Sequence, residues 1–254
     1  MLQKIMIKIK TESEIEIMTA GGKKLVRVKN ALKEATKIGV KASDIEELAK
    51  KLIKAEGAEG SFDKVPGYSW VTCINVNAGL VHGVPGKEII FKKGDVVSVD
   101  VGLYYKGFHT DTSFSVGLDV TPEIQKFLNV GQNALEAAIR VVKADNYVFD
   151  ISRAIELTME AQGYTPIKAL VGHGVGRELH EEPQIPCFVP GRIADSSKLV
   201  VGMTLAVEVM YAQGSDKVEI LPDGWTIAMR DGKISALFEE TVVVTQKGPK
   251  VLTR

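Results

Sequence analysis

The feature that most constrains the fold of this chain is the stretch Gly94 to Val116, GDVVSVDVGLYYKGFHTDTSFSV, which predicts a β-hairpin. β-Branched and aromatic residues over 96–105 favour a first strand, and residues 108–116 favour the return strand. Lys106-Gly107 between them is a typical turn signal. We therefore expect two long antiparallel strands joined by a two-residue turn.

This turn sets the register of the hairpin, pairing Asp100 with Ser113 and Asp111 with Gly102. Side chains alternate between the faces of a strand, so Asp100 and Asp111 project from one face as diagonal neighbours. Two carboxylates held side by side in apolar strands repel each other and raise each other's pKa unless a cation lies between them. The hairpin indicates a cation site, and the alternative is two aspartates that face solvent on a half-exposed sheet.

Acidic residues recur inside strand-like runs later in the chain, Glu208 in TLAVEVM and Glu239 in ISALFEETVVV. Burying several ionised carboxylates requires a compensating charge, and these strands contain no comparable set of lysines or arginines. Four carboxylates with one imidazole exceed what one ion needs and favour two divalent ions about 3.5–4 Å apart, as in dinuclear hydrolases. This donor set disfavours structural zinc and suits Mn, Fe, Co or Zn. For each acid taken alone, an ion pair or a solvent-facing edge position is the alternative.

Three of the four histidines, His82, His173 and His180, lie in passages rich in glycine or proline. Glycine lets the backbone approach a site closely and adopt unusual dihedrals, so these three are candidate functional residues. His109 shares a face with Asp111 in the predicted hairpin, but we interpret it as an ordinary hairpin residue. We expect the loop over 79–86 to lack regular structure.

The remaining segments alternate between helical and strand patterns. A capping box opens the first helix, Ser43 and Asp44 cap the second, and proline occupies the first position of the third. A weak repeat, Gly94-x5-Asp100-Val101 and Gly202-x5-Glu208-Val209, suggests two related halves. The expected helices cover 12–38, 43–55, 122–141 and 149–162, and the further strands cover 1–10, 71–76, 203–212 and 234–245.

Length and composition limit the possible classes. The 254 residues contain no long linker, so we expect a single domain over 1–254. The 32 basic and 32 acidic residues balance, which gives no indication of a nucleic-acid or membrane-surface partner. No apolar run reaches the roughly 18 residues of a membrane span, and the N-terminus does not resemble a signal peptide. Two cysteines give no disulfide framework, so we expect a cytoplasmic protein.

Six segments resemble, in order and in spacing, the type I methionine aminopeptidases, which are metallopeptidases of the pita-bread fold. They are CINVNAGLVHGVPG, GDVVSVDVGLYYKGFHTDTS, GHGVGRELHEEPQ, GMTLAVEVM, DGWT and SALFEETVVVT. The resemblance covers essentially the whole chain. It implies an α+β fold of two pseudo-symmetric αβ halves, with helices on the outer face of a curved antiparallel sheet. It also implies an enzyme that removes the initiator methionine from nascent proteins and peptides, using water activated by two divalent ions.

The resemblance also implies roles for individual residues. His180 would stabilise the tetrahedral intermediate, His82 would contact the substrate near the scissile amide, and Glu208 would carry the proton of the attacking water. The implied metal ligands are Asp100, Asp111, His173, Glu208 and Glu239, with Asp111 and Glu239 bridging the two ions. The implied methionine pocket contains Tyr68, Cys73, Leu179 and Trp225. We expect a monomer that acts on N-termini with a small second residue, at the ribosome.

The chain departs from the family pattern at several positions. Leu179 stands where the family usually has Phe, and Val65 where an aromatic pocket residue is frequent. Val209 replaces a proline, and Glu240 replaces a histidine next to the implied ligand Glu239. We expect the Glu240 side chain to point to the opposite face of its strand.

Two other readings stay open. An aminopeptidase P or prolidase has the same five ligands and cleaves before proline, but usually carries a large N-terminal domain where this chain has only a helical lead-in. A non-catalytic pita-bread binding protein typically lacks ligands, whereas all five positions are filled here. The absence of a zinc-finger extension fits a bacterial-type short form.

Overall fold

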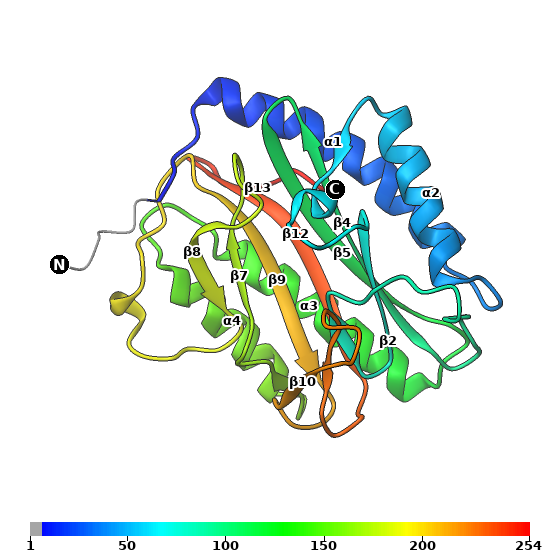
Figure 1. Ribbon diagram of the computed structural model, residues 1–254. Coiled ribbons are helices and arrows are strands. Elements are labelled where there is room, and N and C mark those ends of the chain that lie inside the picture. The colour runs from blue at the N-terminus through cyan, green and yellow to red at the C-terminus, as the bar shows by residue number, and fades with distance from the viewer. Residues whose placement is uncertain (1–6) are drawn as a thin grey trace.

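A ten-stranded antiparallel sheet lies at the centre of the computed structural model, which describes residues 7–254 (Figure 1). Its main strand order is β1-β4-β5-β12-β9-β7-β8, with β2 on β4, β6 on β9 and β13 on β12. A second sheet has the order β10-β11-β3. The strands are β1 (Glu59–Gly60), β2 (Thr72–Val76), β3 (Gly79–Val81), β4 (Val96–Tyr105), β5 (Phe108–Gly117), β6 (Thr165–Pro166), β7 (Val171–Gly174), β8 (Glu181–Pro186), β9 (Thr204–Ala212), β10 (Val218–Ile220), β11 (Ile227–Met229), β12 (Ser235–Thr245) and β13 (Gly248–Val251).

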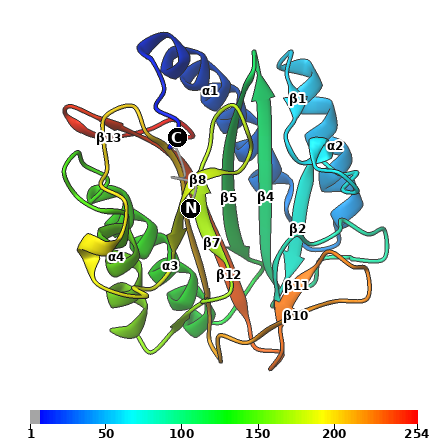
Figure 2. The same ribbon diagram turned by 60° about the vertical axis from the view of Figure 1, so that its left-hand side comes forward.

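Within residues 7–254, four α-helices pack in two pairs against the central strands (Figure 2). In one half α1 packs against β4 and β5, with α2 beside it; in the other half α3 packs against β9 and β12, with α4 beside it. The helices are α1 (Glu12–Ala35), α2 (Ala42–Ala55), α3 (Pro122–Arg140) and α4 (Val148–Glu160). The predicted α+β architecture of two αβ halves is confirmed.

The predicted hairpin is present with the predicted register. Asp100 pairs with Ser113 and Gly102 with Asp111. Lys106 and Gly107 both have positive φ, 49° and 90°, as a two-residue turn matched to the twist of the strands requires. The weak repeat also has a structural counterpart, because Gly94 and Gly202 adopt φ of 89° and 91° just before β4 and β9.

The first helix begins as predicted and ends slightly earlier. The Thr11 hydroxyl accepts a hydrogen bond from the Glu14 N–H, and the Glu14 carboxylate accepts one from the Thr11 N–H, which completes the capping box. The helix stops at Ala35 rather than near residue 38, because Thr36 adopts an extended conformation. Proline at the first position of α3 follows the Thr121 cap as expected.

Two local predictions are wrong, and a third lies partly outside the described residues. The N-cap of α2 is Lys41, and Asp44 lies in the first turn, where its carboxylate accepts the Lys41 N–H at 3.4 Å. The loop over 79–86 begins with the short strand β3, because it pairs with the distant strand β11. Of the expected strand over 1–10, residues 1–6 lie outside the described residues and 7–10 form no strand.

Each half has its own apolar core. One cluster lies between α1, α2 and the first strand pair, and includes Leu25, Ile45 and Val99. The larger cluster lies between α3, α4 and β9, and includes Phe127 and Tyr211. The strands are therefore fixed on their helical face by apolar packing, which leaves the other face to carry polar groups. Among residues 7–254, none of the helices has the length and apolar character that a bilayer crossing requires.

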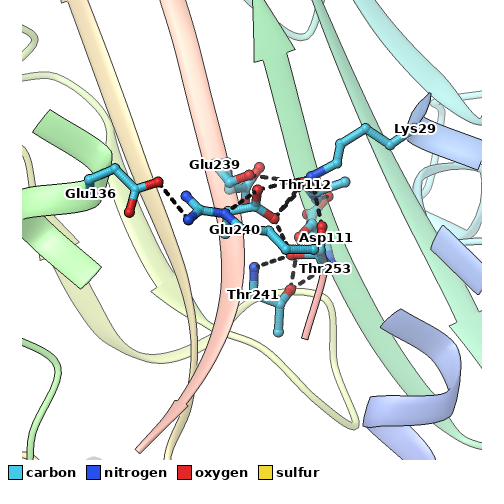
Figure 3. Close-up of polar contacts among 9 residues, drawn as sticks. Lys29, Asp111, Thr112, Glu136, Glu239, Glu240, Thr241 and Thr253 are labelled. Carbon is cyan, nitrogen blue, oxygen red and sulfur yellow. Dashed lines mark hydrogen bonds and ion pairs between the residues drawn. The ribbon is translucent and has the colours of Figure 1, made fainter. Parts of the chain in front are cut away.

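A charged cluster on the helical face surrounds Glu240 (Figure 3). As predicted, its side chain points away from that of Glu239, since Glu239 lines the cavity described below and Glu240 does not. Its carboxylate accepts hydrogen bonds from Lys29 Nζ of α1 at 2.9 Å and from Arg254 Nε at 3.0 Å. The Thr253 hydroxyl also donates to it, and the Arg254 guanidinium continues to Glu136 of α3 at 2.5 Å. The end of the chain thus joins the helices of both halves through one buried carboxylate.

We expect Lys29→Met to lower the free energy of unfolding by about 3 kcal/mol, because breaking a buried ion pair leaves a carboxylate without its full compensation. Burial lowers the pKa of Lys29, and the contact with Glu240 opposes that shift. Urea unfolding followed by circular dichroism measures the change. Lys33→Met, an exposed lysine on the same helix, is the control and should change stability by less than about 0.5 kcal/mol. Equal effects of the two variants would contradict this account.

Candidate metal centre

Acidic side chains from the four central strands converge on one cavity of about 290 Å³. The eleven candidate catalytic, metal-binding and methionine-pocket residues all line this cavity, although they lie far apart in the sequence. The strands β4, β5, β9 and β12 each contribute one carboxylate, and β7 contributes the imidazole. The lining residues among the candidates are Tyr68, Cys73, His82, Asp100, Asp111, His173, Leu179, His180, Glu208, Trp225 and Glu239.

Strand pairing explains why the acids meet. Glu208 and Glu239 lie directly opposite each other on β9 and β12. Ser113 lies opposite both Asp100 and Glu239, so these two acids flank it on neighbouring strands. Opposed residues in antiparallel strands share a face, and therefore one face of the sheet presents all the carboxylates.

Donor atoms from three strands lie close to one another in the cavity. One donor atom from each of Asp111, His173 and Glu239 lies within 4.8 Å of the other two. Glu208 joins the group, with its Oε1 3.9 Å from Nε2 of His173. Such a cluster of carboxylate oxygens around one imidazole matches the preferences of first-row divalent metals.

The electrostatics of the site are unfavourable without a cation. Burial raises the pKa of Asp100, Glu208 and Glu239 well above the usual range, and the neighbouring carboxylates raise it further. Burial also raises the pKa of Asp111, to about 7. Among the described residues, no lysine or arginine forms a salt bridge with these four acids. The lysines and arginines of the described residues therefore do not compensate the negative charge that accumulates here.

Two further observations fit a divalent cation. Oδ1 of Asp100 is buried and has no hydrogen-bond partner, although a buried carboxylate oxygen normally has one. The Nδ1–H of His173 donates to the carbonyl of Gly174 at 2.8 Å, which leaves the Nε2 lone pair directed away from the backbone. Burial and the nearby His180 lower the pKa of His173 to about 3, so its imidazole is neutral and can donate electrons to a metal. The residues present therefore fit a divalent metal site.

An apolar compartment adjoins the acids. Tyr68, Cys73 and Leu179 are buried there and pack with Trp225. The Tyr68 hydroxyl donates to the carbonyl of Thr72 at 2.9 Å, and its ring meets the Trp225 ring edge-on at 5.1 Å between centroids. Burial raises the pKa of Cys73, which keeps it a neutral thiol. The compartment suits an uncharged side chain.

Two histidines lie at the solvent side of the cavity. The ring of His180 lies 4.5 Å from that of His173, and His82 has a positive φ of 57°. Both rings reach solvent, yet the surrounding protein lowers the pKa of each. Neutral imidazoles at this position can donate an N–H or accept a proton from a substrate.

His109 lies outside the cavity lining, as the interpretation of it as a hairpin residue implied. Its Nδ1 lies 2.9 Å from the hydroxyl of Ser61, and its ring packs on Tyr104 at 4.7 Å. Its backbone N–H donates to the carbonyl of Gly176 at 2.7 Å. The residue thus joins the hairpin to the glycine-rich passage that precedes His180.

Two ion pairs also connect the segment that carries His180 to residues at and just before the start of α1. Glu181, the next residue, forms a buried ion pair with Lys10, and Arg177 pairs with Glu14 at the start of α1. Burial lowers the pKa of Lys10, while Glu181 opposes that shift.

Sequence reasoning missed several apolar lining residues. Met210 lies two positions after Glu208 on β9, and period-two alternation would have placed it on the same face. Val81 directly precedes His82. Phe62 lies in a short 3₁₀ turn, and nothing in the local sequence indicates its position at the site.

Comparisons with known proteins agree with this geometry. The model of metallopeptidase family M24 matches residues 16–246. The chain is 38% identical to the methionine aminopeptidase of Clostridium perfringens, over 98% of this chain and 99% of the relative. It is 35% identical to methionine aminopeptidase 1 of Bacillus subtilis, over 98% of this chain and all of the relative.

Solved structures give the same result. The methionine aminopeptidase from Thermotoga maritima superposes with a TM-score of 0.95 at 39% identity, over 98% of this chain and 100% of that one. The prolidase from Pyrococcus furiosus reaches 0.77 at 23% identity, over 97% of this chain and 65% of that one, which is a likeness of fold. The chain belongs to metallopeptidase family M24 and, within it, to the methionine aminopeptidases.

Proposed function

We propose that this chain removes the N-terminal methionine from peptides and nascent proteins by metal-dependent hydrolysis. The observation that carries the proposal is the convergence of four uncompensated carboxylates and a neutral imidazole beside an apolar compartment. The family assignment and the relatives named methionine aminopeptidase support the same reaction.

Two divalent ions, Mn, Fe, Co or Zn, are proposed as the cofactors. Asp100, Asp111, His173, Glu208 and Glu239 would hold them, with Asp111 and Glu239 shared between the ions. When bound, such ions lower the pKa of water and polarise a peptide carbonyl. The number of acidic oxygen atoms supports two ions rather than one.

The residues of the chain supply binding and proton transfer. Glu208 would take a proton from the attacking water and deliver it to the leaving amine, a role that its raised pKa supports. His180 would donate a hydrogen bond to the oxygen of the scissile carbonyl, and His82 would contact the substrate beside the amide. Both side chains line the cavity, and the His180 ring lies 4.5 Å from that of His173.

The apolar compartment is proposed to receive the methionine side chain. Tyr68, Cys73, Leu179 and Trp225 would surround the thioether, which is apolar and adapts to irregular space. Leu179 and Val65 carry less volume than the aromatic residues that the family resemblance implies at these positions. The pocket would consequently accept a broader set of unbranched side chains.

The finer details of the biological setting are also proposals. Residues 1–254 would form one catalytic domain that works as a monomer in the cytoplasm, on substrates with a small second residue, at the ribosome. Both cysteines are free and buried, which is compatible with a reducing compartment. The balanced charge gives no support for direct nucleic-acid binding.

A peptide panel tests the proposal against its nearest alternative. Met-Ala-Ser and several Xaa-Pro peptides would be compared with enzyme loaded with Mn, Fe, Co or Zn. We expect cleavage of Met-Ala-Ser with at least one metal. Faster cleavage of the Xaa-Pro peptides would favour a prolidase-like activity, and absence of metal binding after reconstitution would favour a binding protein.

Glu208→Ala should lower kcat by about a thousandfold or more, since it removes a proposed ligand and proton carrier together. Its circular dichroism spectrum should stay unchanged. The matched control is Glu219→Ala, at an exposed position on β10. Near wild-type turnover by Glu208→Ala would contradict the role assigned to this residue.

Leu179→Phe should raise the preference for methionine over leucine and norleucine, because the larger ring fills part of the pocket. A difference of one methylene group is worth about tenfold or more in kcat/KM, so the shift should be measurable. Leu157→Phe, on the exposed surface of α4, serves as the control. An unchanged ratio across the three substrates would show that Leu179 does not set selectivity.

Divalent cation should stabilise the protein after chelator treatment. At 100 times the dissociation constant, Mn²⁺ should raise the free energy of unfolding by about 2.7 kcal/mol. Asp111 has a pKa raised to about 7, so the metal-free fold is favoured while Asp111 is protonated and loses that stability as pH rises through 7. The gap between metal-loaded and metal-free protein should widen from pH 5 to pH 8.

Urea unfolding at four pH values, with and without MnCl₂, measures this gap. Sodium chloride at equal ionic strength separates specific binding from screening. If the difference in free energy of unfolding with and without MnCl₂ stays constant with pH, protonation of the acids is not coupled to metal binding, which would contradict the prediction.

A further inference from the structure

The two halves of the sheet meet along β5 and β12, and this seam has few direct backbone pairs. Among the described residues, the two strands are paired only at Glu239 with Ser113 and Glu240 with Thr112. By contrast, β9 pairs with β12 without interruption from Ser235 to Val243. Something other than the usual ladder must therefore join the halves beyond this short paired region.

Two side-chain hydroxyls occupy the gaps on either side of the paired region. The hydroxyl of Thr241 accepts the Asp111 N–H at 2.9 Å and donates to the Asp111 carbonyl at 2.8 Å. The hydroxyl of Ser115 accepts the Leu237 N–H at 3.1 Å and donates to the Leu237 carbonyl at 2.7 Å. Each hydroxyl satisfies both backbone groups of the residue across the seam, so it replaces two ladder bonds.

The paired region itself is held by a third hydroxyl. Thr112 donates from Oγ1 to the carbonyl of Glu239 at 2.8 Å, and the same oxygen accepts from Lys29 Nζ at 3.1 Å (Figure 3). The Thr112 N–H also donates to Oδ1 of Asp111 at 3.0 Å. The two acids proposed to be shared between the ions are thus each held by a threonine on the opposite strand. Thr241 of β12 holds the backbone of Asp111, and Thr112 of β5 holds the carbonyl of Glu239.

We propose that Thr241 is a positioning residue that sets the spacing between the Asp111 and Glu239 carboxylates, with Thr112 acting on Glu239 in the same way. The inference rests on the ligand roles assigned under the proposed function. Glu239 and Thr241 lie on the same strand, and Thr241 is fully buried. A displaced Thr241 hydroxyl would leave Asp111 without partners for its N–H and carbonyl, and β5 would shift relative to β12.

Ser115 offers a matched control within the same seam. It forms the same two kinds of backbone hydrogen bond as Thr241, and it is also buried. Its partner Leu237, however, is not a candidate metal ligand. Loss of either hydroxyl should weaken the fold. Only loss of the Thr241 hydroxyl should weaken metal binding.

The test is a calorimetric titration of chelator-treated protein with MnCl₂, alongside thermal unfolding without metal. Thr241→Val keeps the shape and removes the hydroxyl, and it should weaken Mn²⁺ binding by about 10–100-fold, the usual loss for partners that orient metal ligands. Thr241→Ser restores a hydroxyl and should bind within about threefold of the wild type. Ser115→Ala should unfold at a lower temperature yet also bind within about threefold.

The outcomes distinguish failure of the proposed function from failure of the positioning role. A wild-type protein that binds no Mn²⁺ would remove the proposed function itself. Wild-type affinity in Thr241→Val, or equal weakening in Thr241→Val and Ser115→Ala, would overturn the positioning role alone. If Thr241→Val does not fold, Thr112→Val provides the measurement at Glu239, with the same weakening expected and an unchanged affinity counting against the proposal.

Discussion

The repulsion among four carboxylates, three of them buried and the fourth, Asp100, half-buried, is the constraint on which the site depends. Asp100, Asp111, Glu208 and Glu239 come from four adjacent strands and share one face of the sheet. Burial raises the pKa of each, and the neighbouring carboxylates raise it further for Asp100, Glu208 and Glu239, which means that the ionised forms are disfavoured in the folded protein. The strands keep these groups together because apolar cores fix the opposite face of the sheet. The energetic cost of the arrangement is what makes a divalent cation its natural partner.

Strand β12 shows two solutions to the same electrostatic problem at consecutive residues. Glu240 faces the helices, where Lys29 and Arg254 compensate its charge. Glu239 faces the cavity, where the described residues provide no such cation. A carboxylate that only supports the fold has its counter-charge in the protein, whereas one that must bind a cation is left without it. The contrast between the two neighbours marks the cavity face as functional.

Much of this was accessible from the sequence because it depends on local geometry. The turn at Lys106-Gly107 fixed the register of the hairpin, and acids embedded in apolar strands indicated a metal centre. Contacts between distant segments were not accessible: β3 forms only because β11 lies beside it, and Phe62 reaches the cavity from an irregular turn. The hydrogen bonds of Thr241 and Ser115 across the seam could not be predicted for the same reason, because the local sequence of a strand does not indicate which residues lie opposite on a strand far away in the chain.

The buried ion pair between Lys10 and Glu181 links Lys10 to the segment that carries His180. These residues are 171 positions apart, and Glu181 directly follows His180 at the mouth of the cavity. Lys10 therefore helps to hold the segment that carries His180 in place. Loss of Lys10 would leave the Glu181 carboxylate buried without its cation next to His180, so sequence changes near this lysine have to preserve the ion pair.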